Sequence, residues 1–277
     1  MNTPKDNDSL KLQEFRLYLE EKKLSANTIL SYLGSVRLYH QLYPSVTAVN
    51  VKKYRAYLLK TYKPATVNQR IHGFNRYLDF LEIPQYKPMT VKLQQSSYLD
   101  DVISNRDYLA LKRRLKKDGY ETWYFIVWFL AAPGARISEL LKFKAEHLSN
   151  GYMDLCSKGA KIRRIYIPDA LCKEAAAWCA RRGVTSGYLF TNRQGKPLTA
   201  RGVNAQLKYH ARRYKIDPAT VYPHSFRHRF AINFLHRFND ISLLADLLGH
   251  DNVETTRIYL TRSSKEQQQM IDRLVTW

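Results

Sequence analysis

A tyrosine, two histidines and two arginines follow one another in an order that suits attack on a phosphodiester. Tyr259 stands nine residues after His250, and His224 and Arg227 form a His-x-x-Arg pair upstream. Arg136 begins an Arg-x-x-Glu segment earlier in the chain. A tyrosine phenolate is a nucleophile that can hold DNA covalently. Arginines bind the non-bridging phosphate oxygens, and a histidine can carry protons near neutral pH. These side chains therefore predict phosphodiester chemistry that needs no metal ion.

Arg136 is predicted to stand at the start of a helix. An apolar helix over residues 123–130 leads into a Pro-Gly turn, and the segment from Arg136 to Glu139 follows. Amide groups and the helix dipole at such a position also favour an anion. On the motif alone, a surface arginine paired with Glu139 or Glu146 is an equally good interpretation.

Lys158 lies in a Ser-Lys-Gly turn between two predicted strands, 152–157 and 162–168. Alternating residue types in the second strand favour a hairpin. A lysine on a tight turn can be held against a phosphate and can protonate a leaving oxygen. Taken alone, a solvated turn lysine is the better interpretation, and Lys161 is the rival for the same role.

The helix predicted to begin at Pro223 carries His224, Arg227 and His228. His224 and Arg227 are one turn apart and share a face. Histidines at positions i and i+4 can also bind zinc, so His224 and His228 allow a metal-site hypothesis. No glutamate lies between them as in His-Glu-x-x-His motifs, and the third ligand would have to be His250 or an acid. We therefore give the metal site little weight.

The composition indicates a polyanionic partner, with nucleic acid the leading candidate. The 277 residues include 45 Lys and Arg against 24 Asp and Glu, a formal net charge of +21. The charge is spread along the chain, which disfavours a membrane surface. No apolar run reaches the roughly 18 residues of a membrane span, and the polar start lacks a signal-peptide core. The three cysteines form no Cys-x-x-Cys pair and are predicted to be buried free thiols, so we expect a soluble, cytoplasmic protein.

Helices are predicted for most of the chain, with the hairpin as a small interruption. Residues 1–84 contain four apolar patterns at helical spacing, at 10–22, 26–43, 49–62 and from Pro64, with Ser25 as a cap of the second. Residues 85–103 are typical of an extended linker because they contain Pro88 and a polar Gln and Ser run. Ser104 is then predicted to cap the first helix of a second domain, residues 104–277.

The last residues are predicted to form a helix that begins near Ser263-Ser264. A narrow apolar stripe follows, made of Met270, Ile271, Leu274, Val275 and Trp277. On the pattern alone, this helix packs against its own domain.

Five motifs in this order resemble those of the tyrosine recombinases, the integrase family that includes phage integrases and bacterial Xer proteins. Gly-Ala-Arg-Ile-Ser-Glu-Leu matches the first-arginine motif, and Ser-Lys-Gly-Ala-Lys matches the hairpin lysine. Pro-His-Ser-Phe-Arg-His matches the His-x-x-Arg box, and Leu-Leu-Gly-His with Thr-Thr-Arg-Ile-Tyr matches the second histidine and the nucleophile. The resemblance covers nearly the whole chain. Pro133 and Ser157 differ from the frequent Thr and Gly without removing a catalytic group.

The resemblance implies a mainly α fold with a small antiparallel β hairpin, arranged as a two-domain, C-shaped DNA clamp. Residues 1–84 would be the helical core-binding domain, and residues 104–277 the catalytic domain with a C-terminal exchange helix. The function implied is site-specific recombination through a 3′-phosphotyrosyl intermediate and a Holliday junction, with no cofactor or metal. The implied catalytic residues are Arg136, Lys158, His224, Arg227, His250 and Tyr259.

The partners implied are double-stranded recombination sites and a homotetramer that assembles on paired sites through the C-terminal helix. The protein would act in the cytoplasm, bound to the nucleoid. A type IB topoisomerase, a DNA-binding protein without catalysis and a metal-dependent nuclease are the alternatives. The target sequence, the need for accessory proteins and the biological context (integration in a mobile element, excision, resolution or inversion) stay open.

Overall fold

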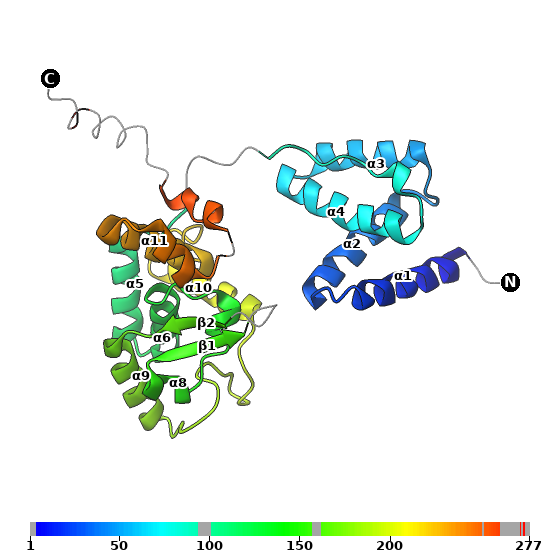
Figure 1. The fold of residues 1–277 in the computed structure, drawn as a ribbon. Coiled ribbons are helices and arrows are strands. Elements are labelled where there is room, and N and C mark those ends of the chain that lie inside the picture. The colour runs from blue at the N-terminus through cyan, green and yellow to red at the C-terminus, as the bar shows by residue number, and fades with distance from the viewer. Residues whose placement is uncertain are drawn as a thin grey trace. The chain divides into compact units, whose positions relative to one another are not determined.

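The chain folds into two compact units, Met1–Gln95 and Ser96–Trp277, which we treat separately (Figure 1). Helices dominate both, and the two described strands pair as one antiparallel sheet, which confirms the predicted fold class. The computed structural model describes residues 4–93, 101–156, 162–250 and 252–260, together with Asp272 and Leu274.

Capping residues set the starts of the helices in the first unit. Ser25 and Thr47 have extended backbones, and each side chain accepts a hydrogen bond at 3.2 Å from the amide three residues on, that of Thr28 or Asn50. Pro64 opens the fourth helix, where its fixed φ suits the first position. The four predicted helices are confirmed, with bounds α1 (Pro4–Glu21), α2 (Ala26–Leu42), α3 (Ala48–Thr61) and α4 (Pro64–Phe80).

Aromatic rings fill the core of the first unit. Tyr39 stacks on Phe74 with ring centroids 4.4 Å apart, and Tyr54 meets Phe74 edge-on at 5.2 Å. All three side chains are fully buried. The Tyr54 hydroxyl donates to the Ser35 carbonyl at 3.2 Å, so its polar end is satisfied. Such pairs stabilise by about 1 kcal/mol beyond their burial, and the unit therefore has a core of its own.

The segment after α4 stays on the first unit. A single turn, η1 (Pro84–Tyr86), leads into an extended stretch. Arg55 Nε donates to the Met89 carbonyl at 2.9 Å, and the Asn68 amide group makes two hydrogen bonds of 2.8 Å with the backbone of Val91. Residues 89–91 of the expected linker are thus bound by side chains of α3 and α4.

The second unit is built around α6 (Glu121–Ala131), which is apolar on nearly every side and buries six of its eleven residues. Ser104 caps the helix before it, as predicted: its hydroxyl accepts from the Asp107 amide at 3.0 Å. None of the described helices is long and apolar enough to span a membrane. The other helices are α5 (Asn105–Lys117), α7 (Ile137–Leu140), α8 (Glu146–Asn150), α9 (Asp169–Arg181), α10 (Ala200–Arg213), α11 (Pro223–Phe238) and α12 (Ile241–Leu248), with the turns η2 (Val253–Thr255) and η3 (Arg257–Leu260).

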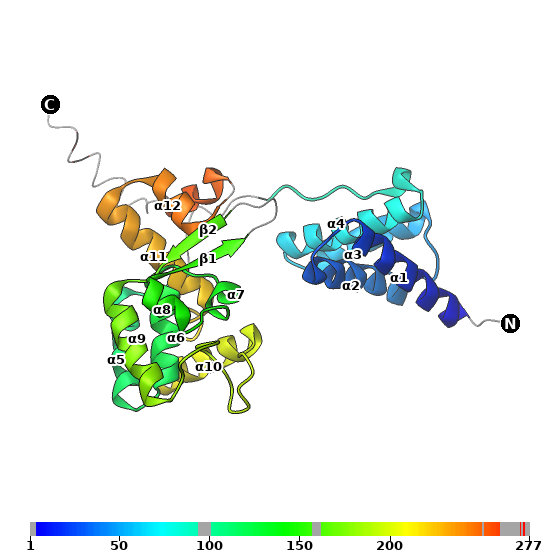
Figure 2. The same ribbon diagram turned by 60° about the horizontal axis from the view of Figure 1, so that its bottom comes forward.

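The predicted hairpin is confirmed, and its second strand ends two residues earlier than the sequence indicated. The strands are β1 (Tyr152–Cys156) and β2 (Ile162–Tyr166). Because side chains alternate along a strand, Arg163 and Ile165 share the inner face of β2, and Arg164 lies on the outer face. The exposed fraction is 11% for the Arg163 side chain and 43% for the Arg164 side chain. In Figure 2, α11 and α12 lie next to this hairpin.

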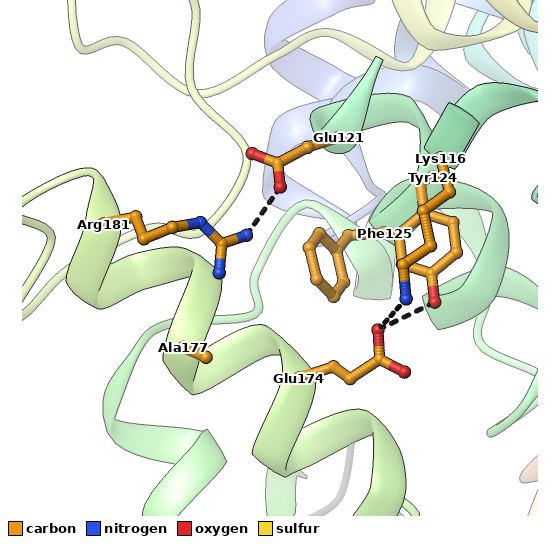
Figure 3. A pocket seen from close by; sticks show the side chains of 7 residues that line it. All are labelled: Lys116, Glu121, Tyr124, Phe125, Glu174, Ala177 and Arg181. Carbon is orange, nitrogen blue, oxygen red and sulfur yellow. Dashed lines mark hydrogen bonds and ion pairs between the residues drawn. The ribbon is translucent and has the colours of Figure 1, made fainter. Parts of the chain in front are cut away.

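A pocket of about 150 Å³ opens between α5, α6 and α9 (Figure 3). Two ion pairs border it. Lys116 Nζ lies 2.8 Å from Glu174 Oε2, and Arg181 Nη2 lies 2.5 Å from Glu121 Oε1. All four charged side chains are about half exposed, so each pair contributes at most about 1 kcal/mol. The pairs tie α9 to α5 and α6.

His210 on α10 is a buried histidine that no predicted function uses. Its side chain is 1% exposed, and neither ring nitrogen has a hydrogen-bond partner among the described residues. The rings of Tyr120 and Tyr209 surround it at centroid distances of 4.8 and 5.3 Å. Burial and, to a smaller extent, the charge of Arg213 lower the pKa of His210 to about 4. The folded protein therefore keeps His210 neutral under conditions that protonate it in the unfolded chain.

We expect His210→Leu to reduce the acid sensitivity of the second unit. Between pH 6.5 and pH 4 the unfolded chain binds a proton here and the folded chain does not, so the free energy of unfolding falls as the pH drops through this range. The slope is at most about 1.4 kcal/mol per pH unit. Urea unfolding followed by tryptophan fluorescence measures it, because all four tryptophans lie in this unit.

The control for this experiment is His236→Leu, which removes an exposed histidine from α11. An identical pH dependence of stability in the wild type and in His210→Leu would contradict the prediction.

Candidate active site

Arg136 stands at the N-cap of α7, close to where the sequence placed it. The Glu139 carboxylate accepts from the Arg136 amide at 2.7 Å and from Arg136 Nη1 at 2.8 Å. The turn before it depends on Gly134, which has a φ of +62°, and a Cβ atom there would lie 2.6 Å from the Phe230 ring. One carboxylate thus holds both the backbone and the side chain of Arg136.

Arg227 reaches the same place from α11. Its side chain is 3% exposed, and it donates from Nη1 to the Gly134 carbonyl at 3.0 Å and from Nη2 to the Leu248 carbonyl at 2.6 Å. Loss of hydration lowers the pKa of Arg227 to about 10, and the charges of Arg136 and Arg163 act in the same direction. The group is still charged at neutral pH, so the site contains a buried positive charge.

The C-terminal end of α12 binds three guanidinium groups. The carbonyls at the end of a helix have no partners within it and carry partial negative charge. Gly249 ends α12 with a φ of +61°. Successive carbonyls there accept from different arginines: Leu247 from Arg163 at 2.8 Å, Leu248 from Arg227 at 2.6 Å and Gly249 from Arg136 at 2.9 Å.

Glu139 faces all three arginines. Its side chain is 9% exposed, and its oxygens lie 2.8 Å from Arg136 Nη1 and 3.9 Å from Arg227 Nη1. Arg163 Nη1 donates to the same oxygen as Arg136 Nη1. One carboxylate does not balance three guanidinium groups, and this excess of positive charge suits a phosphate.

Tyr259 lies against α11 and pairs with His228. Its hydroxyl is 2.9 Å from Nδ1 of His228, which follows the His-x-x-Arg histidine, His224, by one turn on the same helix. Burial raises the pKa of Tyr259, and the charges of Arg227 and Arg136 oppose the rise. Burial is also the main cause that lowers the pKa of His228 to about 4. At neutral pH, Tyr259 therefore faces an uncharged imidazole.

His250 connects Arg227 to the segment that carries Tyr259. Its Nε2 atom lies 3.0 Å from Arg227 Nη2, and its Nδ1 atom lies 2.7 Å from the Thr256 hydroxyl oxygen. A guanidinium only donates, so Nε2 accepts and, in a neutral ring, Nδ1 donates to Thr256. Thr256 is fully buried, and its carbonyl accepts from the Tyr259 amide at 3.0 Å. The contact chain runs from the arginines to the tyrosine.

Other predicted features lie outside the described residues. These are the hairpin lysines, Lys158 and Lys161, and nearly all of the C-terminal segment. Leu274 in that segment is described, and it is 67% exposed. Among the described residues, no group of three or more His, Cys, Asp or Glu side chains could hold a metal ion.

Three residues take part in the site without having been predicted to do so: Arg163, His228 and Thr256. The alternation in the second strand was a signal for Arg163, since it puts a charge on the inner face with Ile165, where a charge needs a partner. His228 was considered only as a metal ligand. Nothing in the sequence pointed to Thr256 as the partner of His250.

The arrangement suits nucleophilic attack on a phosphate diester. Donors that are already in place can stabilise the charge that develops on the phosphoryl oxygens, and Tyr259 lies beside them. A family model described as the phage integrase family matches residues 102–266, most of the unit that holds this site. The chain belongs to this family. It is therefore a tyrosine recombinase, an enzyme that cuts and rejoins DNA at specific sites.

Similar proteins agree with this family. The recombinase is 29% identical over 269 residues to the tyrosine recombinase XerA of Pyrococcus furiosus, covering 95% of this chain and 93% of that protein. It is 30% identical over 284 residues to XerC of Halalkalibacterium halodurans, covering 88% of this chain and 90% of that one. The XerH recombinase, in a crystal structure bound to its difH substrate, has the same fold, with a TM-score of 0.70 at 16% identity over 100% of this chain and 98% of that one.

We expect Gly249→Ala to destabilise this recombinase by more than the backbone cost of an alanine with positive φ, which is about 1 kcal/mol. A Cβ atom at position 249 would lie 2.2 Å from Arg163 Cδ, so the arginine must leave its place. Gly151→Ala is the matched control, because Gly151 has a φ of +74° and no atom within 4 Å of the new Cβ. Urea unfolding measures the loss of unfolding free energy in each variant. Equal losses in Gly249→Ala and Gly151→Ala would show that the contact with Arg163 does not affect stability.

Proposed function

We propose that Tyr259 attacks the scissile phosphate of a recombination site and forms a 3′-phosphotyrosyl link. The bond from phosphorus to the 5′-oxygen breaks, and that oxygen leaves as a hydroxyl after taking a proton. The 5′-hydroxyl of a second strand then attacks the phosphotyrosine and releases Tyr259. Because the phosphotyrosine keeps the bond energy, no nucleotide cofactor is required. The observation that carries this proposal is the hydrogen-bonded chain from Arg227 through His250 and Thr256 to the Tyr259 segment.

The arginines and His250 are proposed to bind the phosphate. Arg136 has a side chain that is 34% exposed, so it can reach a non-bridging oxygen while Glu139 holds its other edge. Arg227 is more deeply buried than Arg136, and its positive charge is proposed to act on the same phosphate. His250 uses both ring nitrogens, so it can bind the phosphate only when Nε2 takes up a proton and donates to a phosphoryl oxygen in place of accepting from Arg227.

His224 and His228 on α11 are proposed to have different roles toward Tyr259: one accepts its proton and the other orients its hydroxyl. His228 holds the hydroxyl in place through the 2.9 Å contact. His224 is exposed, and partial loss of hydration and the charges of Arg227 and Arg136 lower its pKa. It is therefore neutral at physiological pH and able to accept the phenol proton when DNA closes the site.

Tyr259→Phe should keep DNA binding and lose covalent attachment, because only the phenolic oxygen is removed. The DNA that flanks the gene supplies a first candidate site, and a nicked duplex of that site traps the adduct. Arg136→Ala or Arg227→Ala should lower the cleavage rate by about 10²-fold or more, by analogy with the loss of one preorganised oxyanion donor. A covalent adduct that persists in Tyr259→Phe would disprove the assignment.

Lys158 is proposed to protonate the departing 5′-oxygen. A substrate with a 5′-phosphorothiolate leaving group needs no such proton, so it should restore cleavage by Lys158→Ala and not by Arg136→Ala. Lys161→Ala is the comparison within the same hairpin, where we expect only weaker DNA contact. Rescue of Lys161→Ala alone would move the general-acid role to Lys161.

The first unit, through residue 84, is proposed to be a second DNA contact, joined to the catalytic domain by residues 85–103. Exposed lysines on and beside α3 support this: Lys52, Lys53, Lys60 and Lys63. Lysine contacts with phosphates release counterions, which favours binding at low salt.

Two DNA sites and four protomers are proposed to assemble through the C-terminal segment of each chain. A groove of about 270 Å³ lies between α11 and the hairpin, and apolar side chains line much of it, including Ile165, Phe230, Phe234 and Leu247. The apolar stripe near Leu274 fits such a groove on a neighbouring protomer. The exposure of Leu274 supports docking to a second copy rather than to its own domain.

Deleting residues 266–277 should leave single-site DNA binding largely intact and impair assembly of the paired-site complex. Phe234→Glu, which places a charge in the groove, should have the same effect, whereas Leu243→Glu alters an exposed leucine that does not line it. Gel mobility of one-site and two-site complexes measures both steps. Normal assembly and recombination by the truncated protein would rule out exchange of the C-terminal helix.

A further inference from the structure

Arg163 binds two parts of the site at once from inside the fold. Its Nη1 atom donates to Glu139 Oε1, and its Nε and Nη2 atoms donate to the Leu247 carbonyl at 3.2 and 2.8 Å. Glu139 belongs to α7, and Leu247 lies in the last turn of α12. A single planar guanidinium on β2 therefore joins the segment of Arg136 to the segment of His250.

The same contact sets the charge balance of the site. Arg163 and Arg136 donate to one oxygen of Glu139, so the carboxylate is shared between them. Without Arg163, the carboxylate would bind Arg136 and Arg227 more tightly, and less of their charge would act on a phosphate. Arg163 itself is turned away from solvent, with 11% of its side chain exposed against 34% for Arg136.

We propose that Arg163 is a positioning residue for strand cleavage, one that orients Arg136 through Glu139 and holds the end of α12 without touching the phosphate. The inference rests on the proposed function of Arg136 and Tyr259. Its effect should appear in the rate of the chemical step, whereas DNA affinity should change little. Loss of such orientation typically lowers a rate on the order of 10- to 100-fold.

The test compares Arg163→Met and Arg163→Lys with Arg181→Met in the full-length protein. Arg181 lies in the last turn of α9 and pairs with Glu121 of α6 at 2.5 Å, so its loss should leave cleavage unchanged. Arg163→Lys keeps the charge and lacks the fork that binds Glu139 and Leu247 together, so it should also cleave slowly. Single-turnover cleavage of the nicked duplex at saturating protein, DNA affinity and thermal unfolding are measured for each variant.

Two further measurements separate positioning from other roles. In a Glu139→Gln background, Arg163→Met should reduce the cleavage rate by a clearly smaller factor than it does in the wild type, because the two residues act through one contact. A 5′-phosphorothiolate substrate should not rescue Arg163→Met, since the defect concerns the phosphoryl oxygens and not the leaving group. Additive losses, or full rescue by the phosphorothiolate, would overturn the proposal.

The remaining outcomes are also decisive. If wild-type protein forms no adduct, the proposed function fails. If wild type forms the adduct and either Arg163 variant cleaves at the wild-type rate, only the inference about Arg163 fails. If both Arg163 variants lose cooperative unfolding, Arg163 serves the fold and the inference is again wrong.

Discussion

The carboxylate of Glu139 lies among three guanidinium groups, and the geometry of the site depends on that contact. A buried charge is costly unless it is paired and hydrogen-bonded, and Glu139 is satisfied by the amide of Arg136 and by the side chains of Arg136 and Arg163. The arginines in turn are close enough to repel one another, and the carboxylate reduces this repulsion. Removing it would leave like charges together without compensation.

The carbonyl dipoles at the end of α12 also offset the positive charge of the three arginines. Three successive carbonyls accept from three arginines, which requires the helix to stop at that point and the chain to turn. Gly249 makes the stop possible because it adopts a positive φ and leaves room for the Arg163 side chain. The position of His250, the next residue, follows from the same turn. A small residue thereby sets the relation between the arginines and the histidine.

Tyr259 is placed by α11 and by the short turns that precede it. Burial makes its proton harder to remove, while the nearby arginines make the phenolate easier to form. A phosphate bound by those arginines would weaken their effect on Tyr259, and for this reason the proposed mechanism transfers the phenol proton to a neutral histidine. His228 contacts the tyrosine, and His224 lies one turn earlier on α11, 6.2 Å from the His228 ring. Loss of hydration and neighbouring positive charge lower the pKa of both histidines.

The sequence by itself determined the local features: the four N-terminal helices, the caps at Ser25 and Ser104, and the hairpin. Each depends on neighbours within a few residues, and spacing along the chain reveals it. It also indicated the family, because five motifs in fixed order are specific. Only the tertiary structure decided which side chains meet. Arg163 and Glu139 are 24 positions apart, and His228 and Tyr259 are 31 apart. Such pairings depend on how β2, α7, α11 and α12 pack, and no local pattern contains that information.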